Sequence, residues 1–222
     1  MRLQWLFVMH SVREQSFAIC LTDFKGDIMT SLFFVRHAQP DYRKGTDSTY
    51  ELSEEGMTDR LAAKKALEGI RLDAALSSPY RRSIMTIEPI VSERGLVIAE
   101  DIRLCERIKG EGQCNTQEMF LKRWNDFDFC EKGGESLGHT QKRNVEAVSD
   151  ILRSYKDKNV LIGTHGTAFS TIINYYLPDF GYDDFMRMID FMPWVVRMDF
   201  DGDTFLGMEE LAYVYKEFHG VK

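Results

Sequence analysis

The chain has 222 residues, of which 44% are hydrophobic and 28% are charged. This length suits one domain with a sizeable core, and this composition excludes a largely disordered chain. The 35 acidic and 28 basic residues give a formal net charge of −7, which argues against a general nucleic-acid binder because affinity for the phosphate backbone comes from Lys and Arg. A small anionic substrate stays possible, since it needs only a local cluster of positive charge.

The sequence leaves open which structure residues 1–28 form and whether they belong to the domain. Residues 5–8 have strand-like composition, but Met29 stands immediately before the first convincing element. Residues 1–28 are therefore either an extension ahead of a true start at Met29 or a genuine extra strand or arm. The apolar run over residues 3–9 is too short for a membrane-spanning helix or a convincing secretory signal. We expect a single domain over residues 29–222.

The cysteines indicate the compartment. The chain has four cysteines, Cys20, Cys105, Cys114 and Cys130. No two of them form a CxxC pair, and none is spaced from a histidine as in a zinc site. We interpret them as scattered reduced thiols in a cytoplasmic protein without a membrane partner.

Short apolar runs alternate with amphipathic stretches from residue 31 onward. Buried strands are predicted at residues 32–35, 74–76, 96–98 and 160–162. Helices are predicted at residues 53–69, 79–91, 118–124, 137–155 and 168–176. Near the end, residues 194–200 and 204–208 flank Asp-Gly-Asp, which is a hairpin signal. This alternation predicts a three-layer α/β/α sandwich with a mostly parallel sheet and an antiparallel edge.

Two helix starts carry specific predictions. Ser53 is expected to cap the first helix, which would direct Met57, Leu61, Ala62 and Leu67 inward. Similarly, the residue pair at 78–79 predicts a serine cap followed by proline at the first helical position. Residues 107–134 are rich in charge and glycine and are predicted to form an insertion or lid, with one helix and aromatic residues that serve packing.

Ligands in open α/β sheets sit outside the carboxyl ends of the strands. The polar residues that follow the predicted strands are Arg36, His37, Arg82, Glu106 and His165. Arginine binds phosphate oxygens bidentately, imidazole can attack phosphorus, and a carboxylic acid can protonate a leaving alkoxide. A lone histidine or arginine at a strand end is more often structural. Their joint occurrence at one edge favours phosphoryl transfer.

These residues also carry a resemblance to a known family. Phe33-Phe34-Val35-Arg36-His37-Ala38 resembles the Arg-His-Gly motif of the histidine phosphatase superfamily, which has the phosphoglycerate mutase-like fold. Ser77-Ser78-Pro79-Tyr80-Arg81-Arg82 with Thr86, Leu104-Cys105-Glu106, Gly133-Gly134-Glu135-Ser136-Leu137 and Gly163-Thr164-His165-Gly166 are similar to its later motifs, in the same order.

The resemblance implies a role for each matching residue. His37 would be the nucleophile that becomes phosphohistidine, Glu106 the proton donor, and Arg36, Arg82 and His165 the groups that hold the phosphoryl oxygens. Gly166 would contribute to substrate binding, and it stands where the phytase-like branch has Asp. Family members need no metal, so we expect no metal site and no cofactor. The implied partner is a small phosphorylated substrate, while the oligomeric state stays open.

One departure from the family concerns Arg43, which stands where many members have Asn. If Arg43 points inward, it adds a further phosphate ligand; if it points outward, it is a solvated loop arginine. The sequence does not decide between these two interpretations.

Three other functions compete with a phosphomonoesterase. A phosphoglycerate mutase is the nearest, but that branch typically follows its Glu with Arg-His-Tyr-Gly, whereas Arg-Ile-Lys-Gly follows Glu106 here. A protein-directed phosphatase, or an inactive interaction module, is a second alternative because the insertion could form a docking surface. The third is a serine hydrolase, since residues 134–138 satisfy Gly-x-Ser-x-Gly around Ser136, although no strand precedes that motif as a nucleophile elbow requires.

Overall fold

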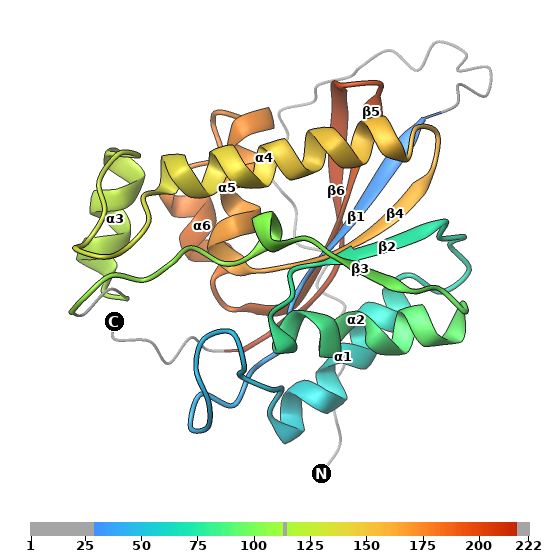
Figure 1. Ribbon diagram of the computed structural model, residues 1–222, viewed down its shortest axis with the longest axis horizontal. Helices are drawn as coiled ribbons and strands as arrows, with labels where there is room; N and C mark the ends of the chain where they lie inside the picture. Colours follow the sequence, from blue (N-terminus) through green and yellow to red (C-terminus); the bar gives the residue numbers. More distant parts are fainter. Residues whose placement is uncertain (1–28, 113–114, 217–222) are drawn as a thin grey trace.

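The computed structural model describes residues 29–112 and 115–216, so the predictions for residues 1–28 lie outside the described residues. Within them the chain forms one six-stranded sheet in the order β3-β2-β4-β1-β5-β6. The strands are β1 (Thr30–Arg36), β2 (Ala74–Ser77), β3 (Ile98–Glu100), β4 (Asn159–Thr164), β5 (Phe191–Asp201) and β6 (Thr204–Tyr215). Figure 1 shows the twisted sheet running through the centre of the molecule.

The sheet is parallel over four strands and antiparallel at one edge. Strands β3, β2, β4 and β1 run parallel, with Leu32 of β1 opposite Val160 of β4. Strand β5 is antiparallel to β1, and β6 returns antiparallel to β5 through a turn in which Gly202 has a φ of 57°. The predicted mixed sheet and its terminal hairpin are confirmed.

Helices cover both faces of the sheet (Figure 1). They are α1 (Glu54–Ala66), α2 (Arg81–Glu93), α3 (Gln117–Asn125), α4 (Leu137–Ser154), α5 (Gly166–Tyr176) and α6 (Tyr182–Met188), with a 3-10 turn, η1 (Ile102–Leu104). Helices α1 and α2 pack on one face, and α4, α5 and α6 pack on the other. This is the predicted three-layer sandwich. No helix among the described residues is long and apolar enough to span a membrane.

Strand β1 is buried on both faces because its side chains alternate between the two cores. Phe33 belongs to the core under α1 and α2, together with Leu67. Phe34 points to the opposite core and stacks on Phe169 of α5, with ring centroids 4.6 Å apart. A strand buried in this way has a continuous apolar sequence, which explains why it was predictable.

The predicted inward face of α1 is partly wrong. Gly56 and Ala63 are buried, whereas Met57 and Leu61 are 37% and 50% exposed. The cause is the loop after β1, because a side chain at position 56 would lie 2.1 Å from the carbonyl oxygen of Gln39. The helix therefore turns its glycine toward this loop, which rotates the two larger residues toward solvent.

The predicted start of α2 is also wrong. Tyr80 is the N-cap residue and α2 begins at Arg81, so Pro79 lies before the helix. The Ser78 hydroxyl accepts from the backbone nitrogen of Tyr80 at 3.2 Å and also lies 2.8 Å from Nε2 of His165. Ser78 therefore combines a local contact before the helix with a contact across the sheet edge.

The insertion contains one helix, as predicted. On α3, Phe120 and Trp124 pack against Phe185 of α6, with ring centroids 5.2 Å and 5.6 Å apart. Trp124 also contacts Phe127 and Phe180 at 5.5 Å and 6.1 Å. These aromatic contacts attach the insertion to the face of the sandwich that carries α6.

Candidate active site

A cleft opens beside the carboxyl ends of β1 and β4. Five of the residues singled out in the sequence line it: Arg36, His37, Arg82, Glu106 and Gly166. His165, directly after β4, lies behind them, with its ring centroid 5.2 Å from that of His37. The structure therefore brings together residues that are far apart in the chain, at the edge of the sheet where they were predicted to meet.

His37 follows the last residue of β1 and is 4% exposed. Its Nδ1 lies 2.8 Å from the carbonyl oxygen of Ala38. A carbonyl can only accept, so Nδ1 carries the hydrogen and the lone pair of the neutral ring is on Nε2. Burial, followed by the charges of Arg82 and Arg36, lowers the pKa of His37 well below 6.5. The imidazole is therefore neutral and nucleophilic at pH 7.

Arg36 ends β1 and is 5% exposed. Its Nη1 donates a 2.6 Å hydrogen bond to the carbonyl of Met188 at the end of α6. Burial lowers the pKa of Arg36 to about 10, so the guanidinium still carries its charge at neutral pH. Gly166 allows this position, because a Cβ there would lie only 3.1 Å from Nε of Arg36.

Arg82 is 3% exposed and is held from the loop that follows β1. Its Nη2 pairs with a carboxylate oxygen of Asp47 at 3.2 Å, and its Nη1 donates to the Asp47 carbonyl. The guanidinium carbon also lies 5.0 Å from the centre of the Tyr80 ring. Asp47 thus orients a charge that would otherwise be poorly compensated in a buried site.

His165 is fully buried, and burial followed by the charge of Arg82 lowers its pKa well below 6.5. Its Nε2 contacts the Ser78 hydroxyl, which also lies 3.4 Å from the Cys105 sulfur. In the part of the chain that the structure describes, Nδ1 of His165 and the Nε atoms of Arg36 and Arg82 are buried without a hydrogen-bond partner. The two arginine Nε atoms are N–H donors of side chains that line the cleft.

Glu106 reaches the beginning of α5. One carboxylate oxygen accepts from the backbone nitrogens of Arg107 and Ala168 at 2.8 Å and 3.0 Å. The other accepts from Thr167 at 3.0 Å. Contacts to a helix N-terminus place the carboxyl group beside Gly166, at the wall of the cleft.

The arrangement has the parts required for in-line attack on a phosphate. A neutral imidazole stands beside two buried arginines, and a carboxyl group is held at the same cleft. Among the described residues, no three His, Cys, Asp or Glu side chains cluster as metal ligands would. Arg36 and Arg82 supply positive charge that can balance a phosphoryl group in this cleft.

The sequence model of the histidine phosphatase superfamily (branch 1) matches residues 32–206. The chain belongs to this superfamily. The match begins in β1 and extends into β6, and it contains each of the five motifs that carry the resemblance in the sequence. The family and the phosphatases among its relatives identify this histidine phosphatase as a phosphoric monoester hydrolase.

Two curated relatives represent different activities. The chain is 27% identical, over 161 residues, to glucosyl-3-phosphoglycerate phosphatase from Mycobacterium tuberculosis, covering 64% of this chain and 72% of that protein. It is 26% identical, over 162 residues, to a 2,3-bisphosphoglycerate-dependent phosphoglycerate mutase from Xanthobacter autotrophicus, covering 64% and 78%.

Solved structures confirm the fold. YhfR from Bacillus stearothermophilus superposes with a TM-score of 0.66 at 26% identity, covering 80% of this chain and 94% of that one. Phosphoserine phosphatase from Entamoeba histolytica, solved with phosphoserine, gives a TM-score of 0.66 at 18% identity, covering 83% and 96%. The mycobacterial glucosyl-3-phosphoglycerate phosphatase gives 0.66 at 21% identity, covering 87% and 100%.

The structure decides two questions that the sequence of this histidine phosphatase raised, the direction of Arg43 and the role of Ser136 in the competing serine-hydrolase interpretation. The Arg43 side chain is 84% exposed and pairs with Asp41 at 2.8 Å, so it is a solvated loop arginine and is not among the residues of the cleft. Ser136 caps α4 by accepting from the backbone nitrogen of His139 at 3.1 Å, and it is 3% exposed. Residues 115–135, all of which the structure describes, contain no strand leading into Ser136, so the Gly-x-Ser-x-Gly match is a helix start.

Several cleft residues of this histidine phosphatase were not predicted from the sequence. They are Tyr42, Asp47, Arg107, Lys109 and Arg123. Arg107 and Lys109 had a local signal, since they lie one and three residues after Glu106. The others come from loops or from α3, where no strand end marks their position.

Proposed function

We propose that this histidine phosphatase hydrolyses small phosphate monoesters through a phosphohistidine on His37. The observation that carries this proposal is the neutral, buried imidazole of His37, with its lone pair on Nε2, in the same cleft as Arg36 and Arg82. In the first step, Nε2 bonds to phosphorus while the bond to the leaving oxygen breaks. Glu106 donates its proton to that oxygen.

The second step returns the enzyme to its starting state. A water molecule attacks the phosphohistidine, the N–P bond breaks, and the Glu106 carboxylate takes the proton of the water. Inorganic phosphate is released and His37 is again neutral. Each step transfers one phosphoryl group and one proton, so the overall reaction is hydrolysis of the ester.

The buried nitrogens without partners support binding of a phosphoryl group. The Nε atoms of Arg36 and Arg82 can each donate to a phosphate oxygen. His165 can donate from Nδ1 if the Ser78 hydroxyl gives its single proton to Nε2.

The outer wall of the cleft supports a substrate with a second acidic group. Arg107 and Arg123 are 3% and 2% exposed and share one carboxylate, that of Glu131, at 3.1 Å and 2.9 Å. Lys109 adds a third cation to this wall. Positive charge therefore exceeds negative charge beside the phosphate position, which favours a metabolite whose leaving group carries a carboxylate or a second phosphate.

Trapping the intermediate tests the nucleophile. Rapid acid-free quenching during turnover should leave base-stable, acid-labile phosphate on His37, and His37→Ala should lose both the label and turnover. Normal turnover by His37→Ala would overturn the proposal. We also expect activity to survive EDTA and to be inhibited by vanadate, which adopts the five-coordinate shape of a phosphoryl transition state.

A substrate panel tests the second acidic group. We expect kcat/KM for 3-phosphoglycerate or phosphoserine to exceed that for glycerol 3-phosphate by about tenfold, which corresponds to one added charge-assisted hydrogen bond. Lys109→Ala and Arg107→Gln should reduce this preference. Equal kcat/KM values across the panel would contradict the assignment, and a preference for phosphopeptides would indicate a protein-directed phosphatase.

A mutase is the second candidate, since one curated relative carries that name. The assay is interconversion of 3-phosphoglycerate and 2-phosphoglycerate with a bisphosphoglycerate primer. Interconversion that outpaces phosphate release would replace the hydrolase assignment. We further propose a cytoplasmic location, on the basis of the scattered cysteines, and fractionation of cells that produce the protein would test it.

A further inference from the structure

The chain segment that carries Glu106 lies outside the sheet. Residues 105–107 come after η1 and belong to no strand or helix. The Glu106 side chain is held by amides of α5, but a carboxyl group keeps its position only if the backbone beneath it is also held. The contacts of that backbone therefore decide where the proposed proton donor sits.

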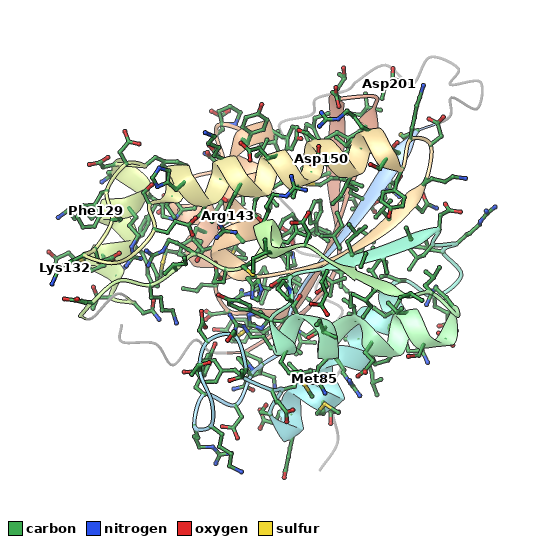
Figure 2. The ribbon with its side chains drawn as sticks, viewed as in Figure 1. Met85, Phe129, Lys132, Arg143, Asp150 and Asp201 are labelled. Atoms are coloured by element: carbon green, nitrogen blue, oxygen red, sulfur yellow. The ribbon has the colours of Figure 1, made fainter. Side chains whose placement is uncertain are left out.

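Arg143 of α4 makes those contacts. Its Nη1 donates to the carbonyls of Arg103 and Cys105 at 2.7 Å each, and its Nη2 donates to the carbonyl of Glu106 at 3.0 Å. Figure 2 shows Arg143 on the side of α4 that faces this segment. One guanidinium thus holds three carbonyls within four residues.

The guanidinium is itself oriented by Glu135. Nε and Nη2 of Arg143 donate to the two carboxylate oxygens of Glu135 at 2.7 Å and 2.8 Å. Both side chains are largely buried, with 21% and 12% exposed. A bidentate pair fixes the plane of the guanidinium, and the remaining N–H groups then point at the carbonyls.

We infer that Arg143 is a positioning residue for the proton donor: it holds the backbone of Glu106, with Glu135 setting its orientation, so that the carboxyl group meets the leaving oxygen. This inference rests on the proposed role of Glu106. Arg143 is not among the residues that line the cleft, so it acts through the Glu106 segment and not on the substrate. Lysine cannot replace it, since an ammonium group lacks the planar fork that reaches a carboxylate and three carbonyls together.

The choice of leaving group separates positioning of the acid from general structural support. An alkoxide needs a proton as it leaves, whereas p-nitrophenolate does not. The comparison uses kcat/KM, which covers only the steps up to departure of the leaving group and so excludes the later attack of water, in which Glu106 acts as a base for either substrate. Arg143→Lys should therefore reduce kcat/KM for an alkyl phosphate such as glycerol 3-phosphate by about 10- to 100-fold, a part of the 10²–10⁴ that a general acid supplies. For p-nitrophenyl phosphate, kcat/KM should stay within about threefold, which also reports that the protein is folded.

Three further variants make the test decisive. Glu106→Gln should show the same split between substrates, and adding Arg143→Lys to it should cause little further loss, because the two residues act as one unit. Glu135→Gln should show a smaller split in the same direction, and it covers the case in which Arg143→Lys fails to fold. Arg153→Lys is the matched control on α4, since Arg153 is 64% exposed and pairs with Asp150. It should change neither rate.

Each outcome has one meaning. Equal losses on both substrates in Arg143→Lys and Glu135→Gln, or no loss on either, would overturn the inference while leaving the proposed function intact. If Glu106→Gln itself shows no split, the donor assignment fails and the inference fails with it. If the unaltered protein hydrolyses neither substrate, the proposed function fails.

Discussion

The backbone N–H of Ala38 donates a 3.0 Å hydrogen bond to the hydroxyl of Thr86, which in turn donates to the carbonyl of Arg82 at 2.7 Å. This single hydroxyl connects the residue after the proposed nucleophile to the helix that carries a proposed phosphate ligand. Ala38 is fully buried, and its φ is not positive, because Asp157 is the one non-glycine residue with positive φ among the described residues. Alanine therefore occupies the position of the family's usual glycine without backbone strain.

Thr86→Val should reduce both stability and activity. Valine has the shape of threonine but leaves the buried Ala38 N–H without an acceptor, which costs about 1–3 kcal/mol. Urea unfolding should show this loss, and kcat for p-nitrophenyl phosphate should fall because the loop after β1 positions His37. Thr58→Val is the control, since Thr58 is exposed on α1 and donates only to the carbonyl of Glu54. Equal effects of the two substitutions would contradict this role.

Stability should decrease as pH falls below about 6.5, the ordinary pKa of histidine. Burial, followed by the charge of Arg82, lowers the pKa of both His37 and His165 well below that value. The unfolded chain then binds protons that the folded chain does not, so the free energy of unfolding falls by up to about 1.4 kcal/mol per pH unit for each histidine. Urea unfolding between pH 7.5 and 5.5 measures this slope. His37→Gln and His165→Gln should each flatten it, and an unchanged slope would contradict the prediction.

Removal of the Glu131 charge should destabilise the insertion. Its carboxylate accepts from two buried guanidinium groups, those of Arg107 and Arg123. Glu131→Gln would leave both with a poorer partner, and loss of one member of a buried ion pair typically costs about 3–5 kcal/mol. Thermal unfolding should detect the loss. Glu111→Gln, in an exposed pair with Lys132, should cost no more than about 0.5 kcal/mol.

Arg43 and Arg82 should respond differently to substitution by alanine. The Arg43 side chain is 84% exposed, so Arg43→Ala should leave KM and kcat within about twofold. Arg82→Ala removes a buried cation from the cleft and should reduce kcat/KM by about 10²-fold or more, as expected for loss of a preorganised charge. A large effect of Arg43→Ala would show that the loop after β1 closes over the substrate.

A shortened protein that begins at Met29 should retain activity, because every residue of the proposed site comes after that position. Its kcat and KM for p-nitrophenyl phosphate would be compared with those of the full chain. A soluble but inactive shortened protein would show that residues 1–28 complete the sheet or the site. The single domain over residues 29–222 stays a prediction until this is measured.

The sequence predicted the elements whose signal is local. The apolar run of β1, the N-cap of α1 at Ser53 and the long amphipathic α4 lie within two residues of their predicted bounds. Strand β3 lies two residues later than predicted, and α6, with seven residues, was missed. Elements this short carry too few periodic positions to stand out.

The sequence also determined which residues meet at the site, as far as strand ends mark them. Arg36 ends β1, whereas His37, Glu106 and His165 follow strands or the turn after one. Parallel strands bring their carboxyl ends to one edge of the sheet. This rule does not depend on the conformation of the loops, so the sequence was sufficient to predict that these residues meet.

Only the tertiary structure decided which charges in the loops belong to the cleft. Arg43 and Arg123 are both arginines in polar segments, yet one pairs with Asp41 in solvent while the other is buried against Glu131. The contact of Arg143 with the Glu106 backbone likewise joins residues 37 apart in the chain. Such contacts depend on how a loop or helix packs against partners distant in sequence, and no local pattern encodes that packing.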